Sequence, residues 1–260
     1  MSATTSFRLV LALALFLFGT LSHADTTLTL KDSEGKRKSI IQIKGNMARI
    51  SNPEKPYYTL YDKRLNTLIR VNDARHRYTE INREALKQQF RNLAQMRQQM
   101  MAQMKAQLAA LPPQQRHEIE QQMGQTKHKA EKIRAVAAGN KKVKGIRCRM
   151  HELYQGKNRI AGVCLATPDD AGMEKTDFTT LMAMLDFMRE MAQQAEAAAG
   201  RSANNDPLIM SGLKGIPLII RDNRNDDELV LGNLSAATLD SAVFTGYRNY
   251  EKQTLAHDLE

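Results

Sequence analysis

The chain has few of the residues from which common enzyme and metal sites are built. Only two of its 260 residues are cysteines, Cys148 and Cys164, and they lack the CxxC spacing that redox and zinc sites use. No GxSxG, P-loop or GxGxxG motif is present. His117-Glu118 begins like a zinc-protease helix, but Gln121 stands where that helix needs its second histidine. We therefore expect a protein that is not an enzyme and has no metal or cofactor.

Long hydrophobic runs are also absent beyond the first residues of the chain. Residues 9–18 are apolar but too short to cross a bilayer, and Arg8 supplies a positive charge before them. Ser22 and Ala24 are the small residues of a signal-peptidase site, so we expect residues 1–24 to be cleaved and 236 residues to remain. Since no cysteine follows that site, we expect no lipid anchor and a soluble, periplasmic protein.

Acidic residues are fewer than basic ones, and the formal net charge is +10, or +9 once Arg8 is lost. Export argues against nucleic acid as the partner, so anionic lipid head groups or acidic envelope polymers are the alternatives. A solvated basic surface without a partner is equally consistent with the composition. The charge is concentrated in residues 127–149, called the basic segment here, where nine Lys or Arg stand against Glu131. We expect this segment to be a partly helical or mobile connector.

Alternation of apolar and polar residues predicts most of the chain's β-structure. Short strands on short turns favour an antiparallel sheet with one buried and one solvated face. The predicted meander strands are residues 26–31, 37–44, 47–51, 57–61, 67–71 and 77–81. Later predicted strands are residues 146–154 with 159–165, 216–221 with 228–234, and a short last strand within 243–250. Folding of the 146–165 hairpin brings Cys148 nearly opposite Cys164, which predicts a structural disulfide between them.

Two long helices have apolar faces rich in methionine. Asn82 is a plausible N-cap for a helix over residues 83–110, which Pro112-Pro113 ends before a more polar helix over 114–123. Thr167-Pro168 is a second helix start, and residues 176–199 form the other long helix, followed by a polar loop over 200–206. Unbranched methionine side chains adapt to irregular surfaces. The first helix is therefore a candidate cover over an apolar ligand.

Three uses of these methionines compete. They can be permanent core packing, they can form a lid that opens over a cavity, or a pair of them, Met100 with Met104 or Met101 with Met104, can bind Cu(I) through their thioethers. Packing or hydrophobic contact is the favoured interpretation, because apolar residues share the same faces. Arg97 falls in the middle of the first helix's apolar face. It can reach the rim or a carboxylate, or it can meet a lipid head group.

The order of these parts resembles that of a protein family. The segments that carry the likeness are YDKRLNTLIRVNDARHRYTEIN, LPPQQR, KVKGIRCRMHELYQGKNRIAGVCLA, GMEKTDFTTLMAMLDFM and GIPLIIRDNRNDDELVLGNL. They resemble the uncharacterised periplasmic domain-of-unknown-function family 4412, which is similar to the LolA and LolB lipoprotein carriers. That resemblance implies a curved antiparallel half-barrel, LolA-like, with helices packed over one face. The carriers' Phe-x-x-Pro-x-Gly-Tyr strand corresponds here to Phe244-Thr245-Gly246-Tyr247, without the proline.

Together these observations predict an α+β fold: one domain over residues 25–250, a helical insertion over 83–136, and a tail over 251–260. We expect a binding protein that shelters a lipid, an acylated protein or another apolar ligand between the sheet and the helices, in an oligomeric state that the sequence leaves open. The predicted ligand-binding wall consists of Phe90, Leu93, Met100, Met101, Met104, Phe178, Met182, Leu185 and Met188. The alternative is an envelope interaction protein that docks acidic partners through the basic segment.

Overall fold

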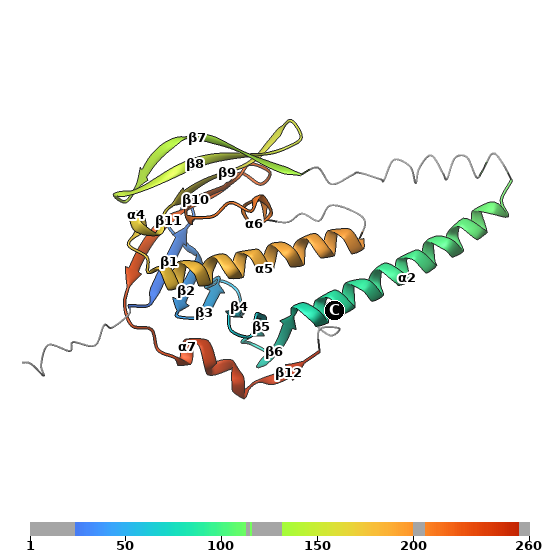
Figure 1. Cartoon of the computed structure of the whole chain (residues 1–260), viewed down its shortest axis with the longest axis horizontal. Coiled ribbons are helices and arrows are strands. Elements are labelled where there is room, and N and C mark those ends of the chain that lie inside the picture. Colours follow the sequence, from blue (N-terminus) through green and yellow to red (C-terminus); the bar gives the residue numbers. More distant parts are fainter. Residues whose placement is uncertain (1–23, 113–114, 116–131, 200–205, 255–260) are drawn as a thin grey trace, which may run out of the picture.

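One large open sheet and a few helices form an α+β structure (Figure 1). This computed structural model describes residues 24–112, 115, 132–199 and 206–254. The first 23 residues, the predicted helix over 114–123 (residue 115 apart), the start of the basic segment and the predicted loop over 200–205 lie outside them. Within the described residues no helix is long and apolar enough to cross a membrane.

The sheet has twelve strands and is antiparallel except at one edge. Its spatial order is β12-β6-β5-β4-β3-β2-β1-β11-β10-β9-β8-β7, and only β12 and β6 run parallel. The six strands of the meander are β1 (Thr26–Lys31), β2 (Arg37–Lys44), β3 (Met47–Ser51), β4 (Tyr57–Asp62), β5 (Thr67–Asn72) and β6 (Arg77–Asn82). The others are β7 (Ile133–Val143), β8 (Ile146–Gln155), β9 (Asn158–Ala166), β10 (Ile216–Asp222), β11 (Asp227–Ala236) and β12 (Glu251–Gln253).

Among the residues that the structure describes, two helices are long and four helical segments are short. The long helices are α2 (Arg83–Ala109) and α5 (Lys175–Ala199). The short segments are α4 (Pro168–Ala171), α6 (Pro207–Ser211), α7 (Ala242–Thr245) and the 3-10 turn η2 (Gly246–Asn249). The predicted caps are confirmed, because Asn82 accepts a hydrogen bond from the Ala85 N–H at 2.8 Å and Thr167 accepts one from the Asp170 N–H.

The main core lies between α5 and the face of the sheet that α5 contacts, called the inner face here. In Figure 1 the strands lie in an arc around α5, and strands β1 to β11 all contribute residues to this core. Leu181, Met184 and Phe187 of α5 are buried in it, with at most 1% of their surface exposed. The beginning of α5 is fixed by Thr180, whose hydroxyl donates to the Gly45 carbonyl oxygen at 2.7 Å. Apolar side chains on several sides of α5 explain why it occupies this central position.

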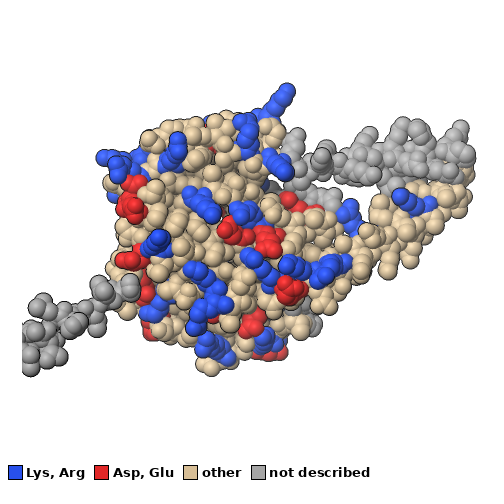
Figure 2. All heavy atoms as spheres, viewed as in Figure 1, with Lys and Arg blue, Asp and Glu red and all other residues tan. Residues whose placement is uncertain are grey.

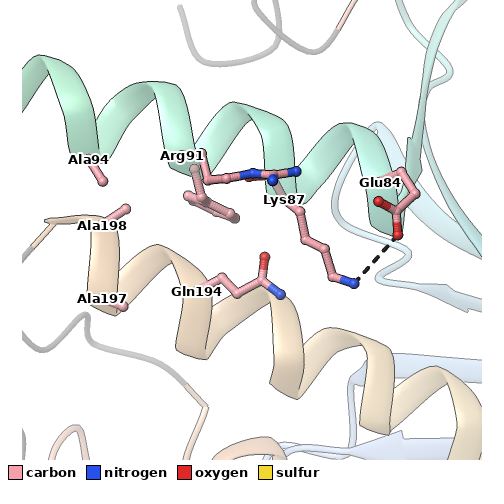
Figure 3. A pocket seen from close by; sticks show the side chains of 8 residues that line it. Glu84, Lys87, Arg91, Ala94, Gln194, Ala197 and Ala198 are labelled. Carbon is pink, nitrogen blue, oxygen red and sulfur yellow. Dashed lines mark hydrogen bonds and ion pairs between the residues drawn. The ribbon is translucent and has the colours of Figure 1, made fainter.

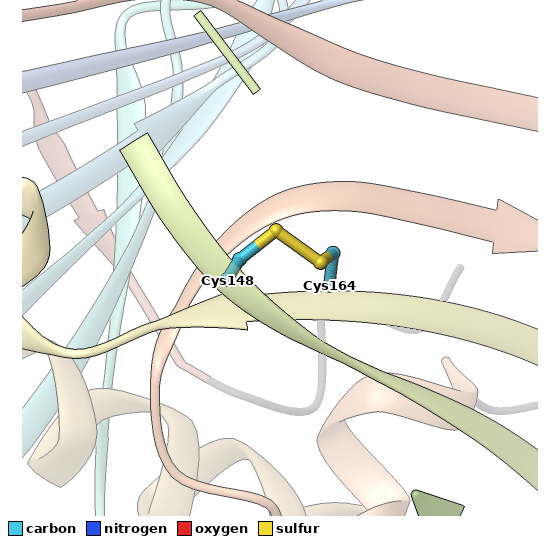
Figure 4. Close-up of a disulfide and its surroundings, with 2 residues drawn as sticks. All are labelled: Cys148 and Cys164. Carbon is cyan, nitrogen blue, oxygen red and sulfur yellow. A yellow bond between two sulfur atoms is a disulfide. The ribbon is translucent and has the colours of Figure 1, made fainter. Parts of the chain in front are cut away.

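The predicted disulfide between Cys148 and Cys164 is confirmed (Figure 4). The register places Met150 directly opposite Cys164, so Cys148 is diagonal to Cys164 rather than opposite it. The two Cα atoms are 5.5 Å apart, within the range that a disulfide spans. Both cysteines are buried in the main core. Disulfides of this kind persist in oxidising, extracytoplasmic compartments.

The prediction of one solvated face is wrong for strands β4 and β5. Tyr61 and Leu68 point into the main core, while Leu60 and Ile69 belong to a second buried cluster on the opposite, outer face. The cover on that side is the chain after β11, through Phe244 and other residues of α7 and η2. The sheet is therefore covered on both faces at this end.

Three predicted boundaries are also wrong. Residues 243–249 are helical rather than part of a strand, because one helical turn directs both Phe244 and Tyr247 onto the outer face of the sheet. Residues 251–253 are not a tail, since they form β12 beside β6. The basic segment is not a connector from residue 133 onward: it forms β7 and the start of β8, so the helical insertion ends before β7.

Candidate functional site

The predicted wall residues are divided between two different environments. On α5, Met182 is buried in the main core, and Phe178, Leu185 and Met188 pack against that core. These four residues therefore fill the inner face of the sheet rather than line a space beneath a lid. Helix α5 does close over the sheet, but its apolar side chains occupy the volume between helix and sheet that a ligand would need.

The predicted wall residues of α2 behave differently, because α2 extends away from the sheet (Figure 1). Phe90 packs against the main core, and Met101 and Met104 are half-buried. Leu93 and Met100 are exposed over 45% and 66% of their surface. Helix α2 contacts α5 rather than covering the strands, so its deformable face lies beside a second helix.

A groove between α2 and α5 is the candidate site. It consists of two adjoining hollows of about 610 and 440 Å³, and both are lined by Ala94 of α2 and by Ala197 and Ala198 of α5. Figure 3 shows Ala94 facing Ala198 across the groove. Phe90 lines the first hollow and Met101 the second, so these are the two predicted wall residues that the structure brings to the groove. Small alanine side chains leave the space between the helices open.

The rim of the groove is mostly basic. Lys87 and Arg91 line the first hollow, and Arg97 and Lys105 line the second. Glu84 is the acidic residue of this lining, and its carboxylate lies 3.4 Å from the Lys87 ammonium (Figure 3). An apolar floor with several cations and one carboxylate at its rim suits an apolar chain that carries a negative charge.

Arg97 has a partner that the sequence did not predict. Its Nη1 donates a hydrogen bond of 3.3 Å to the Ala198 carbonyl oxygen. That carbonyl belongs to the last turn of α5, where backbone oxygens have no partner within the helix and the helix dipole is negative. Arg97 therefore caps α5 and ties the two helices together. An ion pair between Arg83 Nε and Glu190 Oε2, 3.1 Å apart, joins them nearer to the sheet.

The methionines proposed as Cu(I) ligands do not all point into the groove. Met101 lines it, whereas Met100 is exposed to solvent. The part of the chain that the structure describes contains no cluster of three His, Cys, Asp or Glu side chains arranged to hold a metal ion.

A second surface, on the β7–β8 hairpin, was only partly foreseen. Its basic composition and the strand β8 are visible in the sequence, but the strand structure of β7 is not, because alanine and lysine have low β-propensity. A hollow of about 570 Å³ lies beside this hairpin, and its lining includes the basic residues Lys141, Lys142, Arg147 and Arg149 and the acidic Asp170.

Comparisons with known proteins add little to this geometry. No protein-family model matches the chain, and no curated protein matches it either, so its resemblance to family 4412 stays a prediction. The chain is similar to a solved structure of an uncharacterised conserved protein from Thermus thermophilus, over 90% of this chain and 91% of that one. The identity is 6% and the TM-score 0.38, a likeness too low to support a conclusion about fold or function.

Proposed function

We propose that this protein is a soluble periplasmic binding protein rather than an enzyme, and that the groove between α2 and α5 holds an acyl chain with an anionic group at its end. The proposal rests on one observation: the groove has an apolar floor and a basic rim. Phe90 and Ala94 supply the floor, and Lys87 and Arg91 supply the rim. The acyl chain can belong to a lipid or to an acylated protein, as in the LolA-like carriers that the sequence resembles.

The dimensions of the groove support this assignment. Small-molecule sites generally measure about 300–1,000 Å³ and combine an apolar lining with a few polar groups. The two hollows, about 610 and 440 Å³, each fall within that range and share three alanines. The proposed ligand therefore lies between two helices, whereas the sequence placed it between the sheet and a lid.

The direct test is the binding of a dansyl-labelled fatty acid to the mature chain, followed by fluorescence. Ala94→Trp places a large ring in both hollows, and we expect it to weaken binding by about tenfold or more, since the ring occupies the ligand's volume. The matched control is Met96→Trp, which adds the same ring at a side chain that is 66% exposed on the same helix. The control should bind like the unmodified protein.

The role of the rim is tested separately with two probes. Lys87→Glu combined with Arg91→Glu should weaken binding of the labelled fatty acid and leave binding of an equally long, uncharged fatty alcohol almost unchanged. Absence of saturable binding, or equal affinity in the Ala94→Trp protein, would overturn the proposal. Native mass spectrometry of protein purified from the periplasm then distinguishes a lipid from an acylated protein by mass.

A further inference from the structure

The β7–β8 hairpin carries a surplus of positive charge that the fold does not neutralise. Its register places Lys142 opposite Arg147, and Asn140 opposite Arg149. Cross-strand partners point to the same face, so Lys142, Arg147 and Arg149 gather on one face of the hairpin. Lys141 lies opposite the buried Cys148 and therefore points to the other face. Like charges directly opposite one another destabilise a strand pair, so this arrangement has a cost.

Two of the basic residues already have partners. The Asp170 carboxylate binds Arg147 at 2.9 Å from Nε and 2.8 Å from Nη2. Hydrogen bonds from Thr167 and Arg147 lower the pKa of Asp170, which keeps this partner ionised. Lys144 donates to the Gly232 carbonyl oxygen at 2.6 Å. Both residues therefore have a structural role in this fold.

Three further basic side chains of the hairpin contribute to the surplus of positive charge. Lys141, Lys142 and Arg149 are exposed, and they form no ion pair with any residue that the structure describes. Burial and the charge of Arg149 lower the pKa of the neighbouring His151, so this imidazole stays neutral at neutral pH. The hairpin consequently presents unpaired positive charge on both faces of β7. In the view of Figure 2, Lys and Arg side chains lie over this region.

Strand β7 is also a free edge of the sheet. It is last in the strand order and, among the described residues, pairs only with β8. Helix α6 packs against β7, and the strand residues that join the apolar cluster of α6 are Ile133 and Ala135, at the strand's beginning. Residues 136–142 are exposed. A bulge interrupts β7 between Ala137 and Asn140, so the outward backbone N–H and C=O groups that can pair with an added strand are those from residue 140 onward.

We propose that the β7 edge binds an extended, Asp/Glu-rich peptide segment of another protein, which adds to the sheet beside residues 140–143. Backbone hydrogen bonds would supply affinity, and acidic side chains alternating along the segment would reach Lys142 on one face and Lys141 on the other. Cations on both faces of an edge strand fit an added peptide better than a membrane surface, because a bilayer contacts one face only. This surface is separate from the α2–α5 groove.

The test uses fluorescence anisotropy with a labelled octapeptide of mixed Asp, Glu and Val residues and the mature chain. We expect saturable binding that weakens with added salt and falls by about tenfold in Lys141→Glu combined with Lys142→Glu. The control for net charge is Lys157→Glu combined with Lys214→Glu, at two exposed lysines outside the 570 Å³ hollow. Circular dichroism should show the same fold in both double variants.

A second peptide distinguishes binding by strand addition from binding through charge alone. The same octapeptide with every backbone amide N-methylated keeps its charges but cannot donate hydrogen bonds, so we expect it not to bind. Equal binding of both peptides would overturn the proposal, and so would equal binding to both double variants. Binding to phosphatidylglycerol vesicles through Lys141 and Lys142, without binding to the peptide, would assign the surface to a membrane instead. The fatty-acid assay should be unchanged in all of these variants.

Discussion

Asp177 ties the beginning of α5 to the first strand of the sheet. Its side chain is almost fully buried, and the Thr26 hydroxyl donates to its Oδ2 at 2.7 Å. Burial raises the pKa of this carboxyl and outweighs the hydrogen bonds that lower it, and the nearby Asp25 charge adds to the rise. A buried carboxylate at this position therefore makes the fold sensitive to pH.

We expect Asp177→Asn to reduce the pH dependence of stability. A raised pKa means that the folded state holds this proton more tightly than the unfolded state does. The contribution of Asp177 is thus fully present below its ordinary pKa and is lost as the pH rises through the folded value. Asn is neutral at every pH, so the variant does not lose stability in this way. The Tm of Asp177→Asn minus the Tm of the unmodified protein should therefore be larger at about pH 7 than at about pH 3. A difference in Tm that is the same at both pH values would contradict this account.

At the scale of single residues, the sequence predicts contacts between residues that lie close together in the chain. Asn82 and Thr167 were expected to cap helices because a cap bonds to a backbone group three residues away. Arg97 bonds to Ala198, 101 residues further along, and Asp177 bonds to Thr26, 151 residues before it. No local pattern identifies these partners, so the basic rim and the buried carboxyl became visible only in the structure.

At the scale of elements, two helices with similar methionine faces have different environments. Met184 of α5 is fully buried against the sheet, whereas Met100 of α2 is 66% exposed. The sequence contained part of this difference, because Met184, Phe187 and Met191 widen the apolar face of α5 beyond that of a surface helix. The apolar face of α2 is narrower and has glutamines around it, as is typical of a helix with one packed side.

This contrast predicts a large difference between two equivalent substitutions. Met184→Ala should lower the free energy of unfolding by about 2–5 kcal/mol, since it removes buried methylenes and leaves a cavity in the main core. Met100→Ala should change it by less than about 0.5 kcal/mol. Urea denaturation of both variants measures the two values. Similar losses in both would mean that the exposed side of α2 is covered in solution.

Most strands of the meander could be predicted, because alternation is a local property, and the structure confirms their boundaries to within one residue. Strand β7 could not be predicted, because its alanines and lysines do not favour a strand. Its strand conformation comes from pairing with β8. The groove was missed for a related reason. The sequence indicates an apolar face on α2 but not whether that face meets the sheet or α5.

At the scale of the whole molecule, the sheet is held from both sides. Helix α5 covers the inner face, and the segment after β11 crosses the outer face of β3 to β6 before it ends as β12. A sheet covered in this way explains how the described residues pack around the main core, the outer cluster and a third, smaller cluster near α6.

A chain that ends after Asp240 should therefore be much less stable. It lacks Phe244 and Tyr247, so Tyr58, Leu60 and Ile69 lose their cover. We expect Tm to fall by at least about 10 °C, together with binding of the dye ANS to the exposed apolar surface. Tyr250→Phe removes only the 2.8 Å hydrogen bond from the Tyr250 hydroxyl to Asp73 and should leave Tm nearly unchanged. An unaltered Tm in the shortened chain would show that the outer cluster is dispensable.

The pairing of β1 with β11 has a consequence for the order in which the molecule can assemble. Strand β1 lies between β2 and β11, and Thr26 pairs with Ala236. In a chain that is made from its N-terminus, β2 is available to pair with β1 early. Strand β11 becomes available only after about nine-tenths of the sequence has been made. During that interval the first six strands form an incomplete sheet that can recruit a foreign strand. Completion of the sheet is thus a late step, in which β11 pairs with β1.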